Sequence, residues 1–267
     1  MAGALAPTPG DWDLTVRTVR YSLTMYRRIW RSSVFSSFLG PLLYLGAMGF
    51  GLGSLVDARG TASLGGGSYL QFIGPAILAT QAMQTAISDS TFPVFGSVKW
   101  NKSYLAMQAS PLRPKDIYRG HLLFNTGRLA LNSAVYLVVM AAFGAARSPW
   151  VVLGLPAATL TGLAFAAPVQ AWAVTLKAET SFNYVFRFGM IPLMLFSATF
   201  FPLSQLPAWL RPVAYVTPLW HGVDLCRALN SGHVDAGSAA IHVAYLAALA
   251  GFGIWLGGRT YTRRLYV

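Results

Sequence analysis

The sequence has few charged residues. Of its 267 residues only 10% are charged, against about 25% in a soluble domain, while 55% are hydrophobic. This hydrophobicity excludes a disordered basic tail. The 20 basic residues outnumber 8 acidic ones, but the positive charge is too dilute for a soluble nucleic-acid-binding domain. A single soluble core could not bury so many apolar residues, so the chain is predicted to be an integral membrane protein.

Residues for metal binding and covalent chemistry are also scarce. Cys226 is the only cysteine, so the chain has no internal disulfide and no CxxC metal motif. The four histidines form no HExxH motif. The sequence contains no nucleophile elbow, no GxxxxGK[ST] loop and no carboxylate pair suited to acid–base catalysis. We therefore expect no catalytic residues, no metal site and no cofactor in this chain.

Long apolar runs make up most of the sequence. A helix of about 20 apolar residues crosses a bilayer, and six runs of roughly this length occur at 34–55, 69–88, 122–145, 150–176, 185–203 and 239–257. Runs without alternating polarity favour helices over a β-barrel. The predicted fold is an all-α, polytopic membrane domain over 1–267, with six transmembrane helices. Two charges, Arg128 and Arg187, fall inside these runs, and either could act within the membrane or reach its surface.

The basic residues predict the orientation, because they stay on the cytoplasmic side near span ends. With the N-terminus inside, fifteen basic residues lie on the cytoplasmic side and four outside. Both termini are therefore expected in the cytoplasm. Arginine outnumbers lysine 16 to 4, which is typical of a bacterium with a GC-rich genome, so the expected location is a bacterial plasma membrane.

Residues 12–31 are predicted to form an amphipathic helix in the cytoplasmic interface. Its apolar side chains recur at helical spacing, and arginines lie beside them. The apolar stripe consists of Trp12, Val16, Val19, Leu23, Tyr26 and Trp30, and the arginines are Arg17, Arg20, Arg27, Arg28 and Arg31. Leu14, Met25 and Ile29 lie off the stripe, so part of the helix could pack on the bundle. Alternatively, the segment is only a positively charged anchor.

The cytoplasmic loop 92–120 is the longest predicted connection. Four prolines and glycines divide it, and its middle part, 98–109, has helical propensity and mixed polarity. Large apolar side chains are seldom left exposed in clusters, so this part is predicted to dock on a soluble partner rather than to be a solvated loop. The residues expected to do so are Val98, Lys99, Trp100, Asn101, Lys102, Tyr104, Leu105 and Met107.

Residues 204–231 fall outside the membrane in this topology, yet they are strongly apolar. Prolines prevent a continuous span and leave two short helices, at about 208–216 and 219–229. Such a pair is typical of a re-entrant or interfacial hairpin, which could form an extracellular gate. The candidate gate residues here and just before are Phe201, Pro202, Trp209, Pro218, Trp220, His221 and Arg227.

This arrangement resembles the ABC-2 type permeases, the membrane subunits of ATP-binding-cassette exporters, in their NodJ and daunorubicin-resistance (DrrB-like) branch. Residues 72–123 carry the likeness at Pro75, Asp89, Trp100, Tyr104, Ala109, Pro111, Leu112 and Asp116. Residues 200–229 carry it at Phe201, Pro202, Pro207, Trp209, Leu210, Pro218, Leu219, His221 and Arg227. Asp89 and Ser110 replace the Glu and Thr of the family pattern.

The resemblance implies a permease subunit without ATPase activity. Two permease subunits, identical or different, would pair with two nucleotide-binding subunits that carry ATP and Mg. The 98–109 segment would be the coupling helix, with the 12–31 helix bracing it, and the complex would export its substrate.

The substrate implied is amphipathic: a lipid-linked compound, a glycolipid or a hydrophobic drug. Aromatic side chains near the outer rim could hold it, although such residues commonly anchor a protein in the membrane. Two alternatives remain open. One is a polysaccharide exporter with an aromatic-lined channel, and the other is a lipid-modifying membrane enzyme, for which His221 and Asp224 form the only clustered pair.

Overall fold

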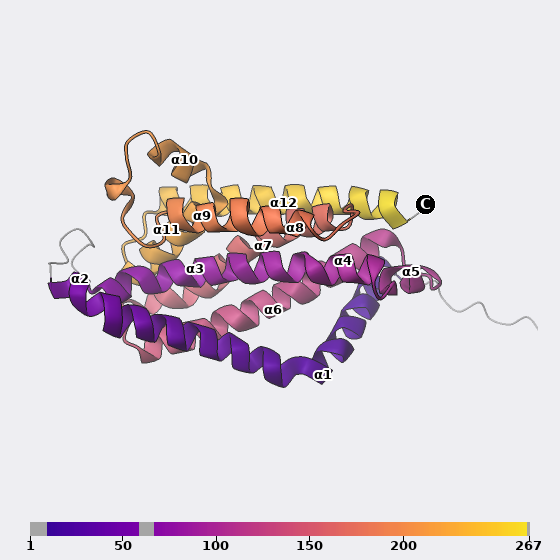
Figure 1. The fold of residues 1–267 in the computed structure, drawn as a ribbon, viewed down its shortest axis with the longest axis horizontal. Coiled ribbons are helices and arrows are strands. Elements are labelled where there is room, and N and C mark those ends of the chain that lie inside the picture. Colours follow the sequence, from indigo (N-terminus) through magenta and orange to yellow (C-terminus); the bar gives the residue numbers. More distant parts are fainter. Residues whose placement is uncertain (1–9, 59–66, 266–267) are drawn as a thin grey trace, which may run out of the picture.

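A computed structural model describes residues 10–58 and 67–265, and in this part of the chain all regular structure is helical. The longer helices run side by side along one axis (Figure 1). In chain order the elements are α1 (Asp11–Gly46), η1 (Ala47–Gly53), α2 (Ser54–Ala58), α3 (Tyr69–Ser90), α4 (Phe92–Lys99), α5 (Ser103–Gln108), α6 (Pro114–Ala142), η3 (Pro149–Leu153), α7 (Gly154–Ala173), α8 (Ser181–Tyr184), η4 (Val185–Met190), α9 (Ile191–Phe196), η5 (Leu203–Gln205), α10 (Arg211–Val216), α11 (Pro218–Ser231) and α12 (Ala236–Leu265).

Four helical segments of the described chain are long and apolar enough to cross a membrane: Leu39–Ala58, Pro114–Ala142, Pro149–Ala173 and Ala236–Leu265. The predicted multi-pass helical architecture is therefore confirmed, while the count of six spans stays a prediction. The second predicted span, α3, carries several glutamine, serine and threonine side chains that lower its hydropathy. The fifth, Ser181–Phe196, is shorter than the roughly 20 residues that cross a bilayer.

Two helices have bounds that differ from the spans predicted on them. Helix α6 begins at Pro114, before the third predicted span at residue 122, because Asp116 accepts a hydrogen bond from the backbone N–H of Arg113 and caps the helix there. The fifth ends at Phe196 instead of residue 203, because Ser197 leaves the helical conformation and Ala198 has a φ of 58°. Polar residues next to an apolar run thus extend or end a helix beyond what hydropathy indicates.

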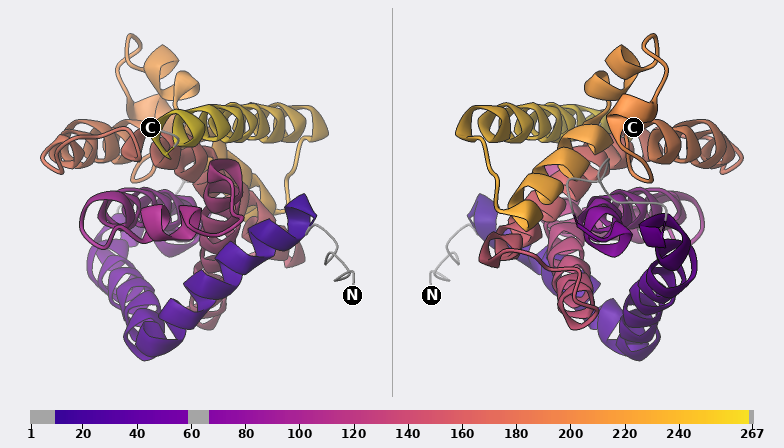
Figure 2. Two further views of the ribbon diagram at one scale, coloured as in Figure 1. Left: turned by 90° about the vertical axis from the view of Figure 1, so that its right-hand side faces the viewer. Right: turned by 90° about the vertical axis from the view of Figure 1, so that its left-hand side faces the viewer.

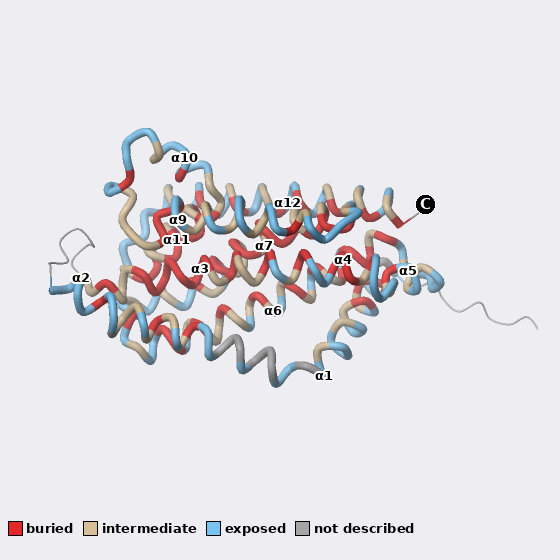
Figure 3. Tube along the Cα trace, viewed as in Figure 1, coloured by how far each residue is buried: buried red, intermediate tan, exposed pale blue. Residues whose placement is uncertain are grey.

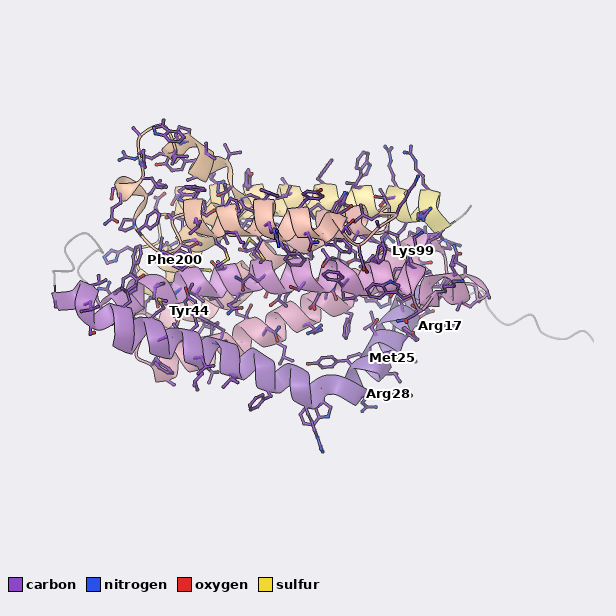
Figure 4. All side chains as sticks on the ribbon, in the orientation of Figure 1. Arg17, Met25, Arg28, Tyr44, Lys99 and Phe200 are labelled. Atoms are coloured by element: carbon purple, nitrogen blue, oxygen red, sulfur yellow. The ribbon has the colours of Figure 1, made fainter. Side chains whose placement is uncertain are left out.

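The predicted interface helix continues without a break into the first predicted span, because α1 runs from Asp11 to Gly46, and η1 and α2 make up the rest of that span. Figure 1 shows α1 as two arms joined by a bend. Seen along the bundle axis, the shorter N-terminal arm crosses the end of the bundle (Figure 2). Arg17 and Met25 lie on this arm and Arg28 near the bend (Figure 4). The expected change of direction between the two segments is therefore present, without a break in the helix.

The core surrounds α7, which contacts α3, α6, α11 and α12, and most buried positions follow these helices (Figure 3). Small residues allow this close approach: a Cβ on Gly257 would lie 2.1 Å from the ring of Tyr118. The Tyr118 hydroxyl donates hydrogen bonds to the carbonyls of Ala167, at 3.1 Å, and Gly253, at 3.0 Å. One buried tyrosine thus joins α6, α7 and α12.

The two ends of the bundle carry different elements. The start of α1, the α4–α5 segment and the end of α12 lie at one end, and α2, α10 and α11 lie toward the other (Figure 1). Arg17 and Lys99 mark the first end, and Tyr44 and Phe200 the second (Figure 4). The predicted topology requires this distribution. Which end faces the cytoplasm stays a prediction.

Candidate functional site

The segment expected to couple to a partner is not one helix. The predicted helix at 98–109 was wrong, because α4 ends at Lys99 and α5 begins at Ser103. The backbone N–H groups of Trp100 and Asn101 both donate to the carbonyl of Gly96, at 2.9 and 2.8 Å, and Lys102 takes a left-handed conformation with a φ of 51°. Two short helices therefore meet at a sharp corner.

Short helix α5 is fixed to the ends of α6 and α12. Tyr104 is buried, its hydroxyl is hydrogen-bonded to the Nδ1 atom of His121, and its ring lies 5.8 Å from that of Tyr261. The side-chain amide of Gln108 donates to the carbonyl of Leu265 at 2.5 Å. A displacement of α5 would therefore act directly on two long helices.

The coupling residues divide into an exposed and an inward group. Lys99, Trp100, Asn101, Lys102 and Leu105 are exposed, with 56% of Trp100 and 45% of Leu105 accessible. We call these five residues the coupling face. Inward, Val98 and Tyr104 are buried and Met107 is half-buried, so they position the segment. The sequence could not separate the two groups, because the corner at Lys102 changes the direction of the chain.

The N-terminal arm of α1 exposes the two ends of its apolar stripe, whereas Tyr26 within the stripe packs against Phe124 of α6, with ring centroids 5.9 Å apart. Trp12 is 68% exposed and Trp30 48%, and the three arginines Arg17, Arg20 and Arg27 are exposed. An exposed stripe of tryptophans beside arginines is what an interfacial helix offers to a lipid surface.

Leu14, Thr15 and Thr18 form the packed face of this arm and are buried. They lie against α6 at Gly120, where a Cβ would come within 2.4 Å of Thr18. Among the residues off the predicted stripe, Leu14 therefore contributes to packing. The short arm is held by close backbone contact at one glycine.

Arg128 and Asp89 form an ion pair between α6 and α3, with 2.9 Å between Nη1 and Oδ1. The Arg128 guanidinium also lies over the ring of Tyr26, 5.3 Å from its centroid, so the N-terminal arm of α1 reaches the same place. The second predicted intramembrane charge, Arg187, is exposed on η4 instead. Of the two arginines, Arg128 is thus the one built into contacts between helices.

Helix α11 is tied to α3 where Pro75 interrupts the backbone hydrogen bonds of that helix. Pro75 has no N–H, so the carbonyl of Gln71 loses its helical partner, and the side-chain amide of Asn230 donates to it at 3.1 Å. The guanidinium of Arg227 donates to the next carbonyl, that of Phe72, at 3.2 Å and to the carbonyl of Thr199 at 2.8 Å. The sequence analysis missed Asn230, because its partner Gln71 is 159 residues away.

The other predicted gate residues occupy different environments. Trp209 is 74% exposed, His221 is buried, and Phe201, Pro202, Pro218 and Trp220 are partly buried. The predicted pair of short helices is present as α10 and α11. Since α11 packs against α3, α7 and α12, it is an integral part of the bundle.

His221 and Asp224 are linked through His242, which is hydrogen-bonded to both. The Nδ1 atoms of His221 and His242 are 2.8 Å apart, and His242 Nε2 lies 3.1 Å from Asp224 Oδ2. The ring of His221 stacks on Tyr245, and burial followed by the neighbouring His242 lowers the pKa of His221. The described residues contain no group of ligands suited to a metal ion. The hydrogen bonds of His242 with His221 and Asp224 tie α11 to α12.

The long apolar helices define the chain as a multi-pass membrane protein. A family profile described as ABC-2 type transporter matches residues 15–229, which is most of the chain. The chain belongs to this family and is a membrane subunit of an ABC transporter.

Proteins named Nodulation protein J are similar to this chain. The one from Rhizobium leguminosarum bv. trifolii is 33% identical over 210 residues, covering 76% of this chain and 78% of the relative. The one from Sinorhizobium fredii is 26% identical over 271 residues, covering 99% and 97%. The one from Bradyrhizobium diazoefficiens is 30% identical over 242 residues, covering 88% and 89%. The similarity to these three relatives therefore covers about three quarters or more of this chain and of each relative.

Proposed function

We propose that this chain is the permease of an ATP-driven exporter and that its coupling face docks on a separate ATP-hydrolysing subunit. ATP and Mg would bind to that subunit, and this chain would form the path through the membrane. Two permease subunits would pair in the complete transporter. In this proposal the end of the bundle that carries α5, the start of α1 and the end of α12 faces the cytoplasm of a bacterium.

The coupling face is the observation that carries this proposal. An exposed tryptophan and leucine beside two lysines form a surface suited to a protein partner, since aromatic residues are enriched in interface cores. Tyr104 and Gln108 anchor α5 to α6 and α12. Movement of the partner would therefore pass into two of the longest helices through a rigid connection.

The proposed substrate is an amphipathic compound, lipid-linked or hydrophobic, that moves outward. Exposed aromatic side chains lie at the end of the bundle opposite α5, where Trp209 is 74% and Tyr215 48% accessible. Aromatic rings provide large contact areas for sugar rings and for apolar groups alike. Release of the substrate near α10 and α11 is consistent with this placement.

The test is co-purification of the full-length chain with its ATP-hydrolysing subunit from membranes. Trp100→Ala and Lys102→Glu are expected to reduce the bound subunit at least tenfold, because they remove an interface anchor and reverse a charge. Trp209→Ala is the matched control, as it removes a tryptophan that is exposed even further, at the other end. Undiminished binding in both coupling-face variants would refute the docking assignment.

A further inference from the structure

A polar cavity lies between α1, α3 and α6. Its volume is about 320 Å³, within the range of roughly 300–1,000 Å³ of ligand pockets. The side chains that line it are mostly polar. They belong to Gln81, Gln84, Thr85, Ser88, Asp89, Arg128, Asn132, Ser133 and Tyr136, with Pro41, Leu78, Ala82 and Leu129 as apolar neighbours.

The polar side chains form two stripes at helical spacing. Asp89 follows Gln81 and Thr85 at intervals of four residues on α3, so the three share one face. Arg128 and Tyr136 flank Asn132 at the same interval on α6. Both stripes fall in segments expected to cross the bilayer, with Asp89 one residue beyond the predicted span 69–88. Polar groups at such depth are costly and commonly mark a substrate path.

Part of this polar lining is unused by the fold. Within residues 10–58 and 67–265, the side chains of Gln81, Thr85 and Ser88 make no hydrogen bond, although all three line the cavity. A hydroxyl or amide group removed from water needs a partner. These three side chains are therefore available to a ligand that offers both donors and acceptors.

The charges in the cavity cancel. Asp89 neutralises Arg128 at 2.9 Å, and the remaining polar side chains of the lining are uncharged. A charged head group would lose its water without gaining a counter-charge, which is unfavourable. Hydroxyl and amide groups would instead find matching partners. The lining thus favours an uncharged polar group.

We propose that this cavity binds the uncharged, hydroxyl- and amide-bearing head group of the transported amphiphile. The inference rests on the proposed export function and adds the place and the chemistry of head-group recognition. Tyr26 lies over Arg128 and Asp89 is next to the last residue of α3, so this part of the cavity is nearer the end of the bundle that carries α4 and α5. A head group entering from the proposed cytoplasmic side meets the cavity there.

The test measures binding to the full-length chain in phosphatidylcholine nanodiscs, with empty nanodiscs as the background. A dodecyl β-glucoside with a fluorophore at the chain end is the probe. Unlabelled dodecyl β-glucoside, dodecyltrimethylammonium and dodecyl phosphate compete with it. We expect the glucoside to compete at least tenfold better than either charged amphiphile.

Two substitutions locate this binding. Gln81→Leu and Thr85→Val are each expected to weaken glucoside binding about 3- to 10-fold, the effect of one lost hydrogen bond. Thr159→Val on α7, where the hydroxyl bonds only to the carbonyl of Leu155, is the matched control and should bind normally. Should Gln81→Leu fail to fold, Thr85→Val, which keeps the side-chain shape, decides the result.

Equal competition by all three amphiphiles, or wild-type affinity in both cavity variants, would overturn the inference. Wild-type affinity in both cavity variants is also the result expected if a second copy of the chain covers the cavity. Export in proteoliposomes with the ATP-hydrolysing subunit separates the two proposals. ATP-dependent export that ignores the head group contradicts the cavity assignment alone, whereas a reconstituted complex that exports no amphiphile contradicts the proposed function.

Discussion

The contact between Asn230 and the carbonyl of Gln71, which has no helical donor because of Pro75, leads to a prediction about stability. The Asn230 side chain donates to the carbonyls of Gln71 and Ala145, both at 3.1 Å, and accepts from the backbone N–H of Arg147 at 3.2 Å. Asn230→Ala removes all three hydrogen bonds from a residue that is 1% exposed. One hydrogen bond contributes about 1 kcal/mol, so the expected loss is about 3 kcal/mol.

Pro75→Ala supplies the matched second substitution. An alanine at this position restores the N–H that can donate to the carbonyl of Gln71. In the Asn230→Ala background it should therefore recover about 1 kcal/mol. In the otherwise unchanged chain, that carbonyl already has Asn230 as its partner, so Pro75→Ala gives no such gain. The two substitutions should be non-additive by about 1 kcal/mol, as expected for residues that share a partner.

Thermal unfolding of the four proteins in one detergent is the assay. At about 2–4 °C per kcal/mol for a chain of this size, Asn230→Ala should lower Tm by roughly 6–12 °C. Pro75→Ala should then raise it by about 2–4 °C in that background. Strict additivity of the two changes, or an unchanged Tm in Asn230→Ala, would refute the view that Asn230 of α11 supplies the hydrogen bond that the carbonyl of Gln71 loses at Pro75.

Three other predictions concern separate contacts. Gly120→Val should lower the free energy of unfolding by about 1–3 kcal/mol through overpacking against α1. Gly127→Val is the control and should lower it by less than about 1 kcal/mol, because a Cβ at Gly127 meets no atom within 4 Å. Equal melting temperatures of the two variants would contradict this. The lowered pKa of His221 means that this imidazole binds a proton more tightly in the unfolded chain than in the folded one. Its contribution to folding stability should therefore be full above about pH 6.5 and fall as the pH drops below that value. A melting temperature that stays constant from pH 8 to 5 would exclude this. Arg128→Met should cost about 3 kcal/mol by leaving Asp89 without its counter-charge, and Arg128→Met with Asp89→Leu should recover most of that loss; a double variant no more stable than the single one would argue against the pair.

The sequence predicted the helical membrane fold well, because apolar runs of span length have few other solutions in a bilayer. It also placed α10 and α11 close to their observed bounds, since prolines restrict where a helix begins. The limits of α6 and of the Ser181–Phe196 segment were less accurate. Both depend on local capping and backbone conformation, to which hydropathy is insensitive.

The arrangement of the candidate site could be expected from the sequence only in part. Tryptophan and lysine in the 92–120 loop indicate a docking segment, and Trp100 and Lys102 are exposed, while docking itself stays a prediction. The burial of Tyr104 could not be foreseen, because its partners His121 and Tyr261 come from two distant helices. The same holds for Asn230 of α11, whose role depends on the carbonyl that Pro75 leaves without a donor in α3. Contacts between helices far apart in sequence leave no spacing pattern in one sequence.

Cross-linking from the coupling face tests the central claim most directly. Cys226 is the only cysteine of this chain and is 1% exposed, so Leu105→Cys gives the chain a single accessible thiol. A short thiol–amine cross-linker should join this position to the ATP-hydrolysing subunit, and Trp209→Cys should give no such product. A product from Trp209→Cys with none from Leu105→Cys would contradict the account.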